Sequence, residues 1–146
     1  MRTEILSQGS NNYCFVCGQT NPIGLKLKFY LENNSYVVTE FTPRKEHCGW
    51  KNVVHGGILC AIMDETMSWA VLHIKKETGV TKEMNLKFKH PVFINEKIMI
   101  RSKITNASKK EIRLLSEIIN QNGVICTVAE GIYAILDKEK INNLFR

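Results

Sequence analysis

The stretch most suggestive of chemistry is residues 54–66, where a Gly-Gly pair stands seven residues before an acidic pair in an otherwise apolar segment. The pattern predicts a helix that begins at about Gly57, ends at about His73, and carries Asp64 and Glu65. The start of a helix presents free backbone N–H groups and a positive dipole end, which suit a developing oxyanion. A carboxylate among apolar residues can act as a base or a nucleophile.

The spacing of these groups indicates how such a site must be assembled. Seven residues advance a helix by about 10 Å, and the N–H of Gly57 points beyond the helix start, away from Asp64. One helix therefore hardly grips a single carbonyl with both groups. In a two-fold dimer each helix start can lie beside the middle of its partner helix, so that Gly57 of one chain would face Asp64 of the other.

The neighbours of these residues have two interpretations each. Glu65 lies about 100° around the helix from Asp64, so at most one of the two carboxylates points at the same reacting carbon. His55 either caps and packs against the helix or shapes a substrate-binding loop. Gly56 and Gly57 either relieve crowding at the junction of loop and helix or supply backbone donors.

Length and composition predict one domain. The chain has 146 residues, of which 44% are hydrophobic, so we expect a single domain over residues 1–146 with a flexible N-terminal arm at residues 1–12. The first residues lack the apolar run of a signal peptide, so we expect a soluble, cytoplasmic protein without a membrane partner. The net charge of +6 is compatible with nucleic acid, a membrane surface or a phosphate-bearing ligand.

Five cysteines without an export signal favour reduced thiols over disulfides. Cys14 and Cys17 form a Cys-x-x-Cys pair, but zinc needs two more ligands, and the adjacent His47 and Cys48 would be strained as a pair. We therefore expect no metal. A basic nucleic-acid binder built on a zinc knuckle would need further ligands and would leave Asp64 unexplained, so we expect no nucleic-acid partner.

Strands surround the predicted helix in the sequence. Period-two alternation and turn residues predict a hairpin before the helix and four strands after it. The predicted strands are residues 25–31, 36–41, 82–92, 97–105, 111–120 and 124–136. A largely apolar helix needs cover on most of its surface, so we expect an α+β domain in which an antiparallel sheet of about six strands wraps around one long central helix.

The order His55-Gly56-Gly57, followed by Asp64 nine residues after the histidine, resembles the signature of hotdog-fold acyl-CoA thioesterases of the PaaI type. Residues 14–18, 21–25 and 88–92 are also similar to members of that group, and the resemblance extends from residue 14 to about residue 136. It implies the hotdog fold, a homodimer or a homotetramer built as a dimer of dimers, and thioester hydrolysis at the dimer interface.

The resemblance also implies residue roles by position. Gly57 would supply the oxyanion N–H, and Asp64 of the facing subunit would be the base or nucleophile. Thr81 falls where related enzymes place a small hydroxyl residue near the reacting water. Many relatives carry an amide side chain in the loop before the His-Gly-Gly, and Asn52 is the candidate for that role in this chain.

Three lysines, Lys82, Lys87 and Lys89, alternate with apolar residues close to the predicted site. Each is either the solvated face of a strand or, as a group, a contact for the phosphates of coenzyme A. The resemblance implies an acyl-CoA thioesterase that needs no cofactor beyond its substrate. A non-catalytic acyl-CoA-binding module stays open as an alternative, and the sequence does not specify the acyl group.

Overall fold

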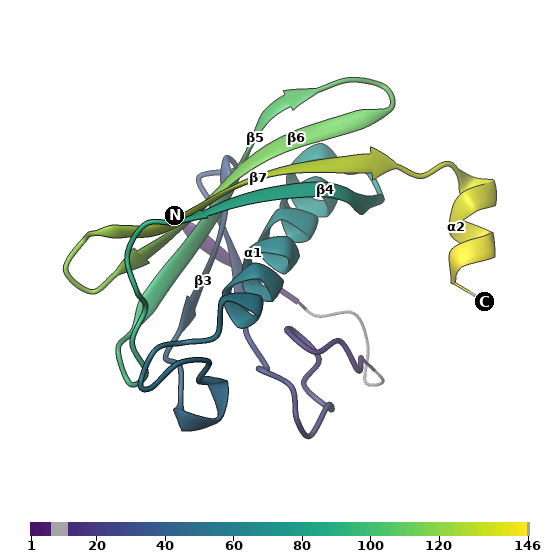
Figure 1. Ribbon diagram of the computed structural model, residues 1–146. Helices are drawn as coiled ribbons and strands as arrows, with labels where there is room; N and C mark the ends of the chain where they lie inside the picture. The colour runs from purple at the N-terminus through teal and green to yellow at the C-terminus, as the bar shows by residue number, and fades with distance from the viewer. Residues whose placement is uncertain (7–11, 146) are drawn as a thin grey trace.

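The computed structural model describes residues 1–6 and 12–145, which form an antiparallel sheet wrapped around one helix (Figure 1). The seven strands lie in the order β1-β2-β3-β5-β6-β7-β4. They are β1 (Arg2–Ile5), β2 (Phe29–Glu32), β3 (Tyr36–Phe41), β4 (Gly79–Phe88), β5 (Ile98–Ala107), β6 (Glu111–Asn120) and β7 (Ile125–Ile135). The predicted architecture is confirmed, with one strand more than the sequence patterns indicated.

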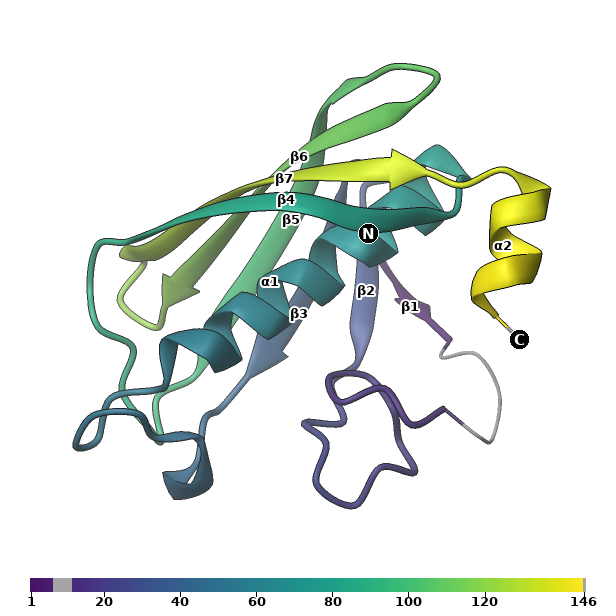
Figure 2. The ribbon, with the colours of Figure 1, turned by 45° about the vertical axis from the view of Figure 1, so that its right-hand side comes forward.

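The central helix α1 (Gly56–Ala70) continues into a π-helical turn, η2 (Val71–Lys75), and ends at Lys76 in a left-handed conformation with φ 62°. It leads from β3, in the interior of the sheet, to β4, which forms one edge, and it lies along the concave face of the sheet (Figures 1 and 2). The stretch Gly56–Lys75 is long and apolar enough to cross a membrane by length and composition. Here the sheet covers it, as is typical of a core helix.

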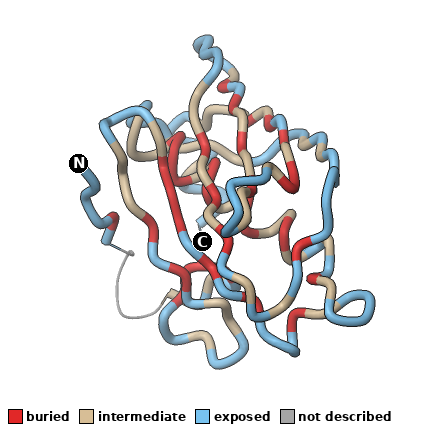
Figure 3. The backbone as a smooth tube through the Cα atoms, turned by 90° about the vertical axis from the view of Figure 1, so that its left-hand side faces the viewer, coloured by how far each residue is buried: buried red, intermediate tan, exposed pale blue. Residues whose placement is uncertain are grey.

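The core lies between this helix and the sheet. Alternate residues of β5, β6 and β7 are buried, which matches the period of a strand with one face on the helix. Figure 3 shows the buried positions gathered along the strands and helix, with exposed residues at the turns. On the helix, the fully buried residues include Ile62, Met63 and Met67. The helix therefore has a fixed rotation relative to the sheet, which fixes the direction of its polar residues.

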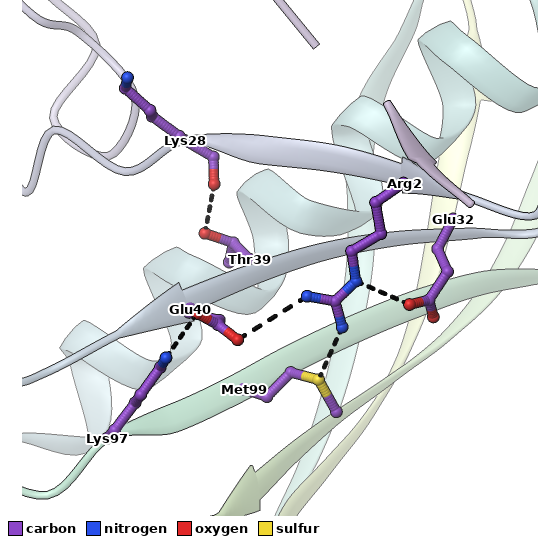
Figure 4. Close-up of polar contacts among 7 residues, drawn as sticks. All are labelled: Arg2, Lys28, Glu32, Thr39, Glu40, Lys97 and Met99. Carbon is purple, nitrogen blue, oxygen red and sulfur yellow. Dashed lines mark hydrogen bonds and ion pairs between the residues drawn. The ribbon is translucent and has the colours of Figure 1, made fainter. Parts of the chain in front are cut away.

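The predicted flexible arm is wrong for its first part. Residues 2–5 form β1 and pair with β2, and Ile5 is buried. Figure 4 shows why this strand is held: the Arg2 guanidinium lies 2.8 Å from Glu32 and 3.7 Å from Glu40, which itself lies 2.7 Å from Lys97. The rest of the arm includes residues 7–11, which lie outside the described part of the chain.

Two further elements differ from the predictions. The strand predicted over residues 25–31 begins only at Phe29, because Leu25 and Leu27 donate their N–H groups to the turn at residues 15–16 and Lys26 has a φ of 54°. A short helix, α2 (Lys138–Leu144), follows β7 and is capped by Asp137, whose carboxylate accepts the N–H of Lys140. A 3-10 turn, η1 (Lys45–His47), precedes the helix α1.

Candidate active site

Asp64 lies in the middle of α1 with its carboxylate directed at the sheet. Its Oδ1 accepts two hydrogen bonds, one from the Thr81 hydroxyl at 2.5 Å and one from the Tyr133 hydroxyl at 2.6 Å. The Tyr133 hydroxyl also lies 3.0 Å from the backbone carbonyl oxygen of Asp64. In the described residues no donor contacts the second carboxylate oxygen, Oδ2. One oxygen is therefore fixed while the other is free to meet water or substrate.

The sheet brings the two hydroxyls together. Thr81 in β4 and Tyr133 in β7 are directly paired in the antiparallel ladder, so their side chains leave the same face toward α1. Tyr133 is fully buried, and burial together with the neighbouring Asp64 raises the pKa of its phenol. The hydroxyl thus stays protonated at neutral pH and acts as a hydrogen-bond donor to the carboxylate.

Tyr133 was not predicted as a site residue, because it lies 69 positions after Asp64 and only the strand register brings the two together. Its ring needs space that Gly131 leaves. A Cβ at Gly131 would lie 2.8 Å from the Met67 sulfur and 2.9 Å from the Tyr133 ring, both shorter than real Cβ contacts. The glycine in the middle of β7 is the available sequence signal, since glycine in a strand often marks close approach of another group.

His55 caps the start of α1. Its Nδ1 accepts the N–H of Gly57 at 2.8 Å, and its backbone carbonyl accepts the N–H of Ile58 at 3.0 Å. The capping interpretation of His55 is therefore confirmed. The structure differs from the prediction for Gly57, because the N–H expected to bind an oxyanion already has an acceptor. Gly56, one residue earlier, is the first helical residue, and its N–H has no acceptor among the described residues.

The helix start borders a cavity of about 300 Å³. Gly56 lies close to Phe88 at the end of β4, since a Cβ on Gly56 would lie 3.4 Å from the ring. Phe88 keeps 56% of its surface exposed. Lys89 and His90 complete this side of the cavity. A free backbone donor, an exposed aromatic ring and a lysine thus surround one hollow.

Glu65 turns away from Asp64, as its position on the helix predicts. Its Oε1 lies 3.6 Å from the sulfur of Cys14, in the turn that precedes β2. Burial raises the pKa of Glu65 to about 7. The two carboxylates therefore belong to different environments, and only Asp64 contacts Thr81.

The other predicted binding residues are scattered. Lys82 forms an ion pair with Glu111. Lys87 is paired with Val128 on the face of the sheet opposite to Asp64, where it lines a separate hollow with Lys89. Asn52 is exposed, has a φ of 56°, and contributes its backbone carbonyl to the N–H of Ile94. Of the three lysines, only Lys89 also borders the cavity at the helix start.

Comparison with known proteins agrees with this architecture. A family model described as the thioesterase superfamily matches residues 51–127, which include the helix start, Asp64 and Thr81. An uncharacterized protein of Schizosaccharomyces pombe is 27% identical over 110 residues, a stretch covering 72% of this chain. That alignment spans 62% of the length of the yeast protein.

Two solved structures are similar in fold. The PaaI protein of the E. coli phenylacetic acid degradation operon has a TM-score of 0.71 and 17% identity, with 77% of this chain and 81% of that one covered. A hypothetical thioesterase from Streptococcus pneumoniae TIGR4, solved with coenzyme A, has a TM-score of 0.66 and 17% identity, with 69% and 81% covered. With a family model that matches more than half of its length and a sheet that wraps around one central helix, this chain belongs to the thioesterase superfamily and has the hotdog fold.

Proposed function

We propose that this protein is an acyl-CoA thioesterase that hydrolyses a coenzyme A thioester to a free acid and coenzyme A. The observation that carries the proposal is the Asp64 carboxylate: two hydroxyls hold one of its oxygens, while the other accepts no hydrogen bond from the described residues. Superfamily membership supports thioester hydrolysis as the reaction. The neighbour solved with coenzyme A supports a coenzyme A substrate.

In this proposal the thioester carbonyl oxygen accepts the N–H of Gly56 at the start of α1. We place the donor at Gly56 rather than Gly57 because the Gly57 N–H is held by His55. Asp64 either takes a proton from the attacking water or attacks the carbonyl carbon itself. In the first route water adds to the carbonyl carbon, the C–S bond breaks, and the thiolate of coenzyme A leaves. In the second route the C–S bond breaks to leave a mixed anhydride between the acyl group and Asp64, which water then hydrolyses to the free acid and the Asp64 carboxylate.

The two groups cannot act on one carbonyl within a single chain. Gly56 and Asp64 are eight residues apart, which is about 12 Å along a helix, and the N–H of Gly56 points beyond the helix start. A second chain must therefore bring its Gly56 to this Asp64. We propose that the active unit is a homodimer with two shared sites, alone or within a tetramer.

Strand β4 is the natural place for that contact. It is ten residues long, lies at the end of the sheet, and has no strand on its outer side in the described part of the chain. Thr81 near one end contacts Asp64, and Phe88 at the other end lies against Gly56. Antiparallel pairing of β4 with its two-fold copy, centred midway between Thr81 and Phe88, would bring Gly56 of one chain toward Asp64 of the other.

The first test is Asp64→Asn, which keeps the shape and removes the basic oxygen. With a panel of purified acyl-CoAs and detection of the released thiol, we expect kcat to fall on the order of a hundredfold or more, with a smaller change in KM. Asp137→Asn makes the same chemical change at the cap of α2, outside the proposed sites, and is the matched control that should retain turnover. Wild-type protein that binds acyl-CoA but releases no thiol across the panel would instead identify a non-catalytic binding module.

The oxyanion donor is tested by Gly56→Pro. Proline is tolerated at the first position of a helix, and the ψ of 129° at His55 suits a residue before proline, so the substitution removes the N–H with little strain. Gly56→Ala keeps the N–H and is the control. A folded Gly56→Pro protein with normal kcat would eliminate Gly56 as the donor.

A mixed dimer tests the shared site. Chains carrying Gly56→Pro and Asp64→Asn under different tags should each be nearly inactive as homodimers. Their heterodimer has one site with both defects and one with neither, so we expect about half of the wild-type activity. An assembled but inactive heterodimer would show that both groups act within one chain.

A further inference from the structure

Cys14, Cys17 and Glu65 form a cluster that the proposed thioesterase chemistry does not use. The two cysteines lie in the turn before β2, and the glutamate projects from α1, 48 residues after Cys17 in the sequence. One ligand-capable atom from each of the three residues lies within 4.8 Å of the other two. His47 and Cys48 are the further ligands that the sequence suggests, whereas the fold supplies a carboxylate from Glu65.

One separation within the cluster has the length of an edge of a tetrahedral zinc site. The Cys14 sulfur lies 3.6 Å from Oε1 of Glu65. Zinc bonds of about 2.3 Å to sulfur and about 2.0 Å to a carboxylate oxygen, at the tetrahedral angle, place these two atoms about 3.5 Å apart. The existing separation therefore matches one edge of a zinc tetrahedron without movement of α1.

The turn around the cysteines is built to hold thiolates. The N–H of Cys17 donates to the Cys14 sulfur at 3.5 Å, and the side-chain amide of Asn12 donates to the Cys17 sulfur at 3.4 Å. A Cβ at Gly18 would lie 2.4 Å from the backbone oxygen of Asn12, so only glycine permits this close turn. Such N–H donors orient and stabilise metal-bound thiolates as outer-shell partners.

The cluster concentrates acidic groups without a cation. In the described residues no lysine or arginine forms an ion pair with Glu65. Two thiols and a carboxyl group that lie together without a paired cation among the described residues offer a divalent cation three ligand atoms.

We propose that Cys14, Cys17 and Glu65 bind one thiophilic divalent cation, Zn²⁺, with water as the fourth ligand. The three residues line part of a cavity of about 540 Å³ that also contains Ser68 and Thr78, so water reaches the fourth position. The bound ion fastens the turn around residues 12–18 to the central helix, one position along from Asp64. The proposal does not depend on the thioesterase function, because it rests only on this cluster.

The test uses the full chain without a histidine tag, reduced, stripped of metal and titrated with Co²⁺ or Zn²⁺. We expect one equivalent of Co²⁺ to give a thiolate-to-cobalt charge-transfer band and the intense visible bands of tetrahedral coordination, both removed by Zn²⁺. Zn²⁺ should also raise Tm, because it binds the folded state. Cys14→Ser and Cys17→Ser should weaken binding at least about tenfold.

Glu65→Gln and Cys48→Ser complete the design. Glu65→Gln should weaken binding but keep the charge-transfer band, since both thiolates stay, whereas Cys48→Ser should bind like the wild type. A measurement without variants is protection from iodoacetamide: Zn²⁺ should shield Cys14 and Cys17 but not Cys48, as read by peptide mass spectrometry. Reduced wild-type protein that shows no charge-transfer band and no protection would overturn the proposal. Formation of only a Cys14–Cys17 disulfide, without metal binding by the reduced chain, would do the same.

Discussion

Tyr133→Phe is the substitution that most directly examines how the site is built. It deletes one oxygen atom and keeps the buried ring, which Gly131 accommodates. The deleted hydroxyl lies 2.6 Å from Oδ1 of Asp64 and 3.0 Å from its backbone carbonyl oxygen. Thr81 keeps its own hydrogen bond to the same carboxylate oxygen. The substitution therefore leaves Asp64 with one of its two side-chain hydrogen bonds, the one from Thr81.

The magnitude follows from the kind of bond. A hydrogen bond to a charged group contributes about 1.5–3 kcal/mol. If that energy holds Asp64 in its reactive orientation, its loss lowers kcat by about ten- to a hundredfold, because about 1.4 kcal/mol corresponds to a factor of ten. KM should change little, since Tyr133 is fully buried and contacts the carboxylate.

The assay compares kcat and KM for thiol release from one acyl-CoA with Tm from thermal unfolding. Tyr30→Phe is the matched control, because it makes the same chemical change at a tyrosine whose hydroxyl has no hydrogen-bond partner in the described structure. A Tyr133→Phe protein that folds and keeps the wild-type kcat would refute a positioning role for the hydroxyl. A parallel fall of kcat in Tyr30→Phe would show that the effect is not specific to the site.

Further substitutions address the surroundings of the site and the stability of the fold. Gly131→Ala should lower stability by about 1–3 kcal/mol, measured by urea unfolding, because its Cβ would lie 2.8 Å from the buried Met67 sulfur. Lys89→Ala should raise KM for acyl-CoA severalfold, because Lys89 borders the cavity at the helix start and is placed to contact the phosphates of coenzyme A. KM for the same acyl group on N-acetylcysteamine, which has no phosphates, should stay unchanged. Lys87→Ala should have a weaker effect, because Lys87 does not border this cavity. Burial lowers the pKa of His47 below its usual 6.5, so the unfolded chain binds the proton more readily, and stability from this residue, complete above about pH 6.5, is lost as the pH falls through the lowered pKa. The fall of Tm below pH 6.5 should therefore be smaller in His47→Gln than in the wild type.

The parts of the fold that the sequence predicted are those with a local signal. Alternating apolar residues mark the strands after the helix, and an apolar helix implies a sheet that covers it. Strand β1 was not predicted, because its four residues are mostly exposed. It is held by ion pairs of Arg2 with Glu32 and Glu40, which lie more than 25 positions away in the sequence. Such contacts have no periodicity that a single sequence displays.

The residues of the candidate site likewise divide into those with a local sequence signal and those placed by tertiary contacts. Asp64 was predictable as a candidate, because placing a carboxylate within an apolar helix costs free energy that a protein seldom spends without a function for the group. The role of His55 as a cap was among the local interpretations, since one side chain reaching a nearby backbone N–H needs no tertiary information. The same hydrogen bond occupies the N–H of Gly57, so the N–H that an oxyanion could use is that of Gly56. A capping side chain occupies one of the unpaired N–H groups at a helix start.

Tyr133 and the partners of Glu65 show what local patterns do not contain. The tyrosine reaches Asp64 only because β7 pairs with β4 in one register, and a shift by a single residue would turn its ring to the outer face of the sheet. Glu65 meets Cys14 only because α1 is rotated so that Asp64 faces the strands. Since adjacent helical residues diverge by about 100°, the rotation that supplies one carboxylate to the hydroxyls of the sheet necessarily delivers the next one to the cysteine turn. The positions of Asp64 and Glu65 therefore both follow from one packing arrangement, the burial of Ile62, Met63 and Met67 against the sheet.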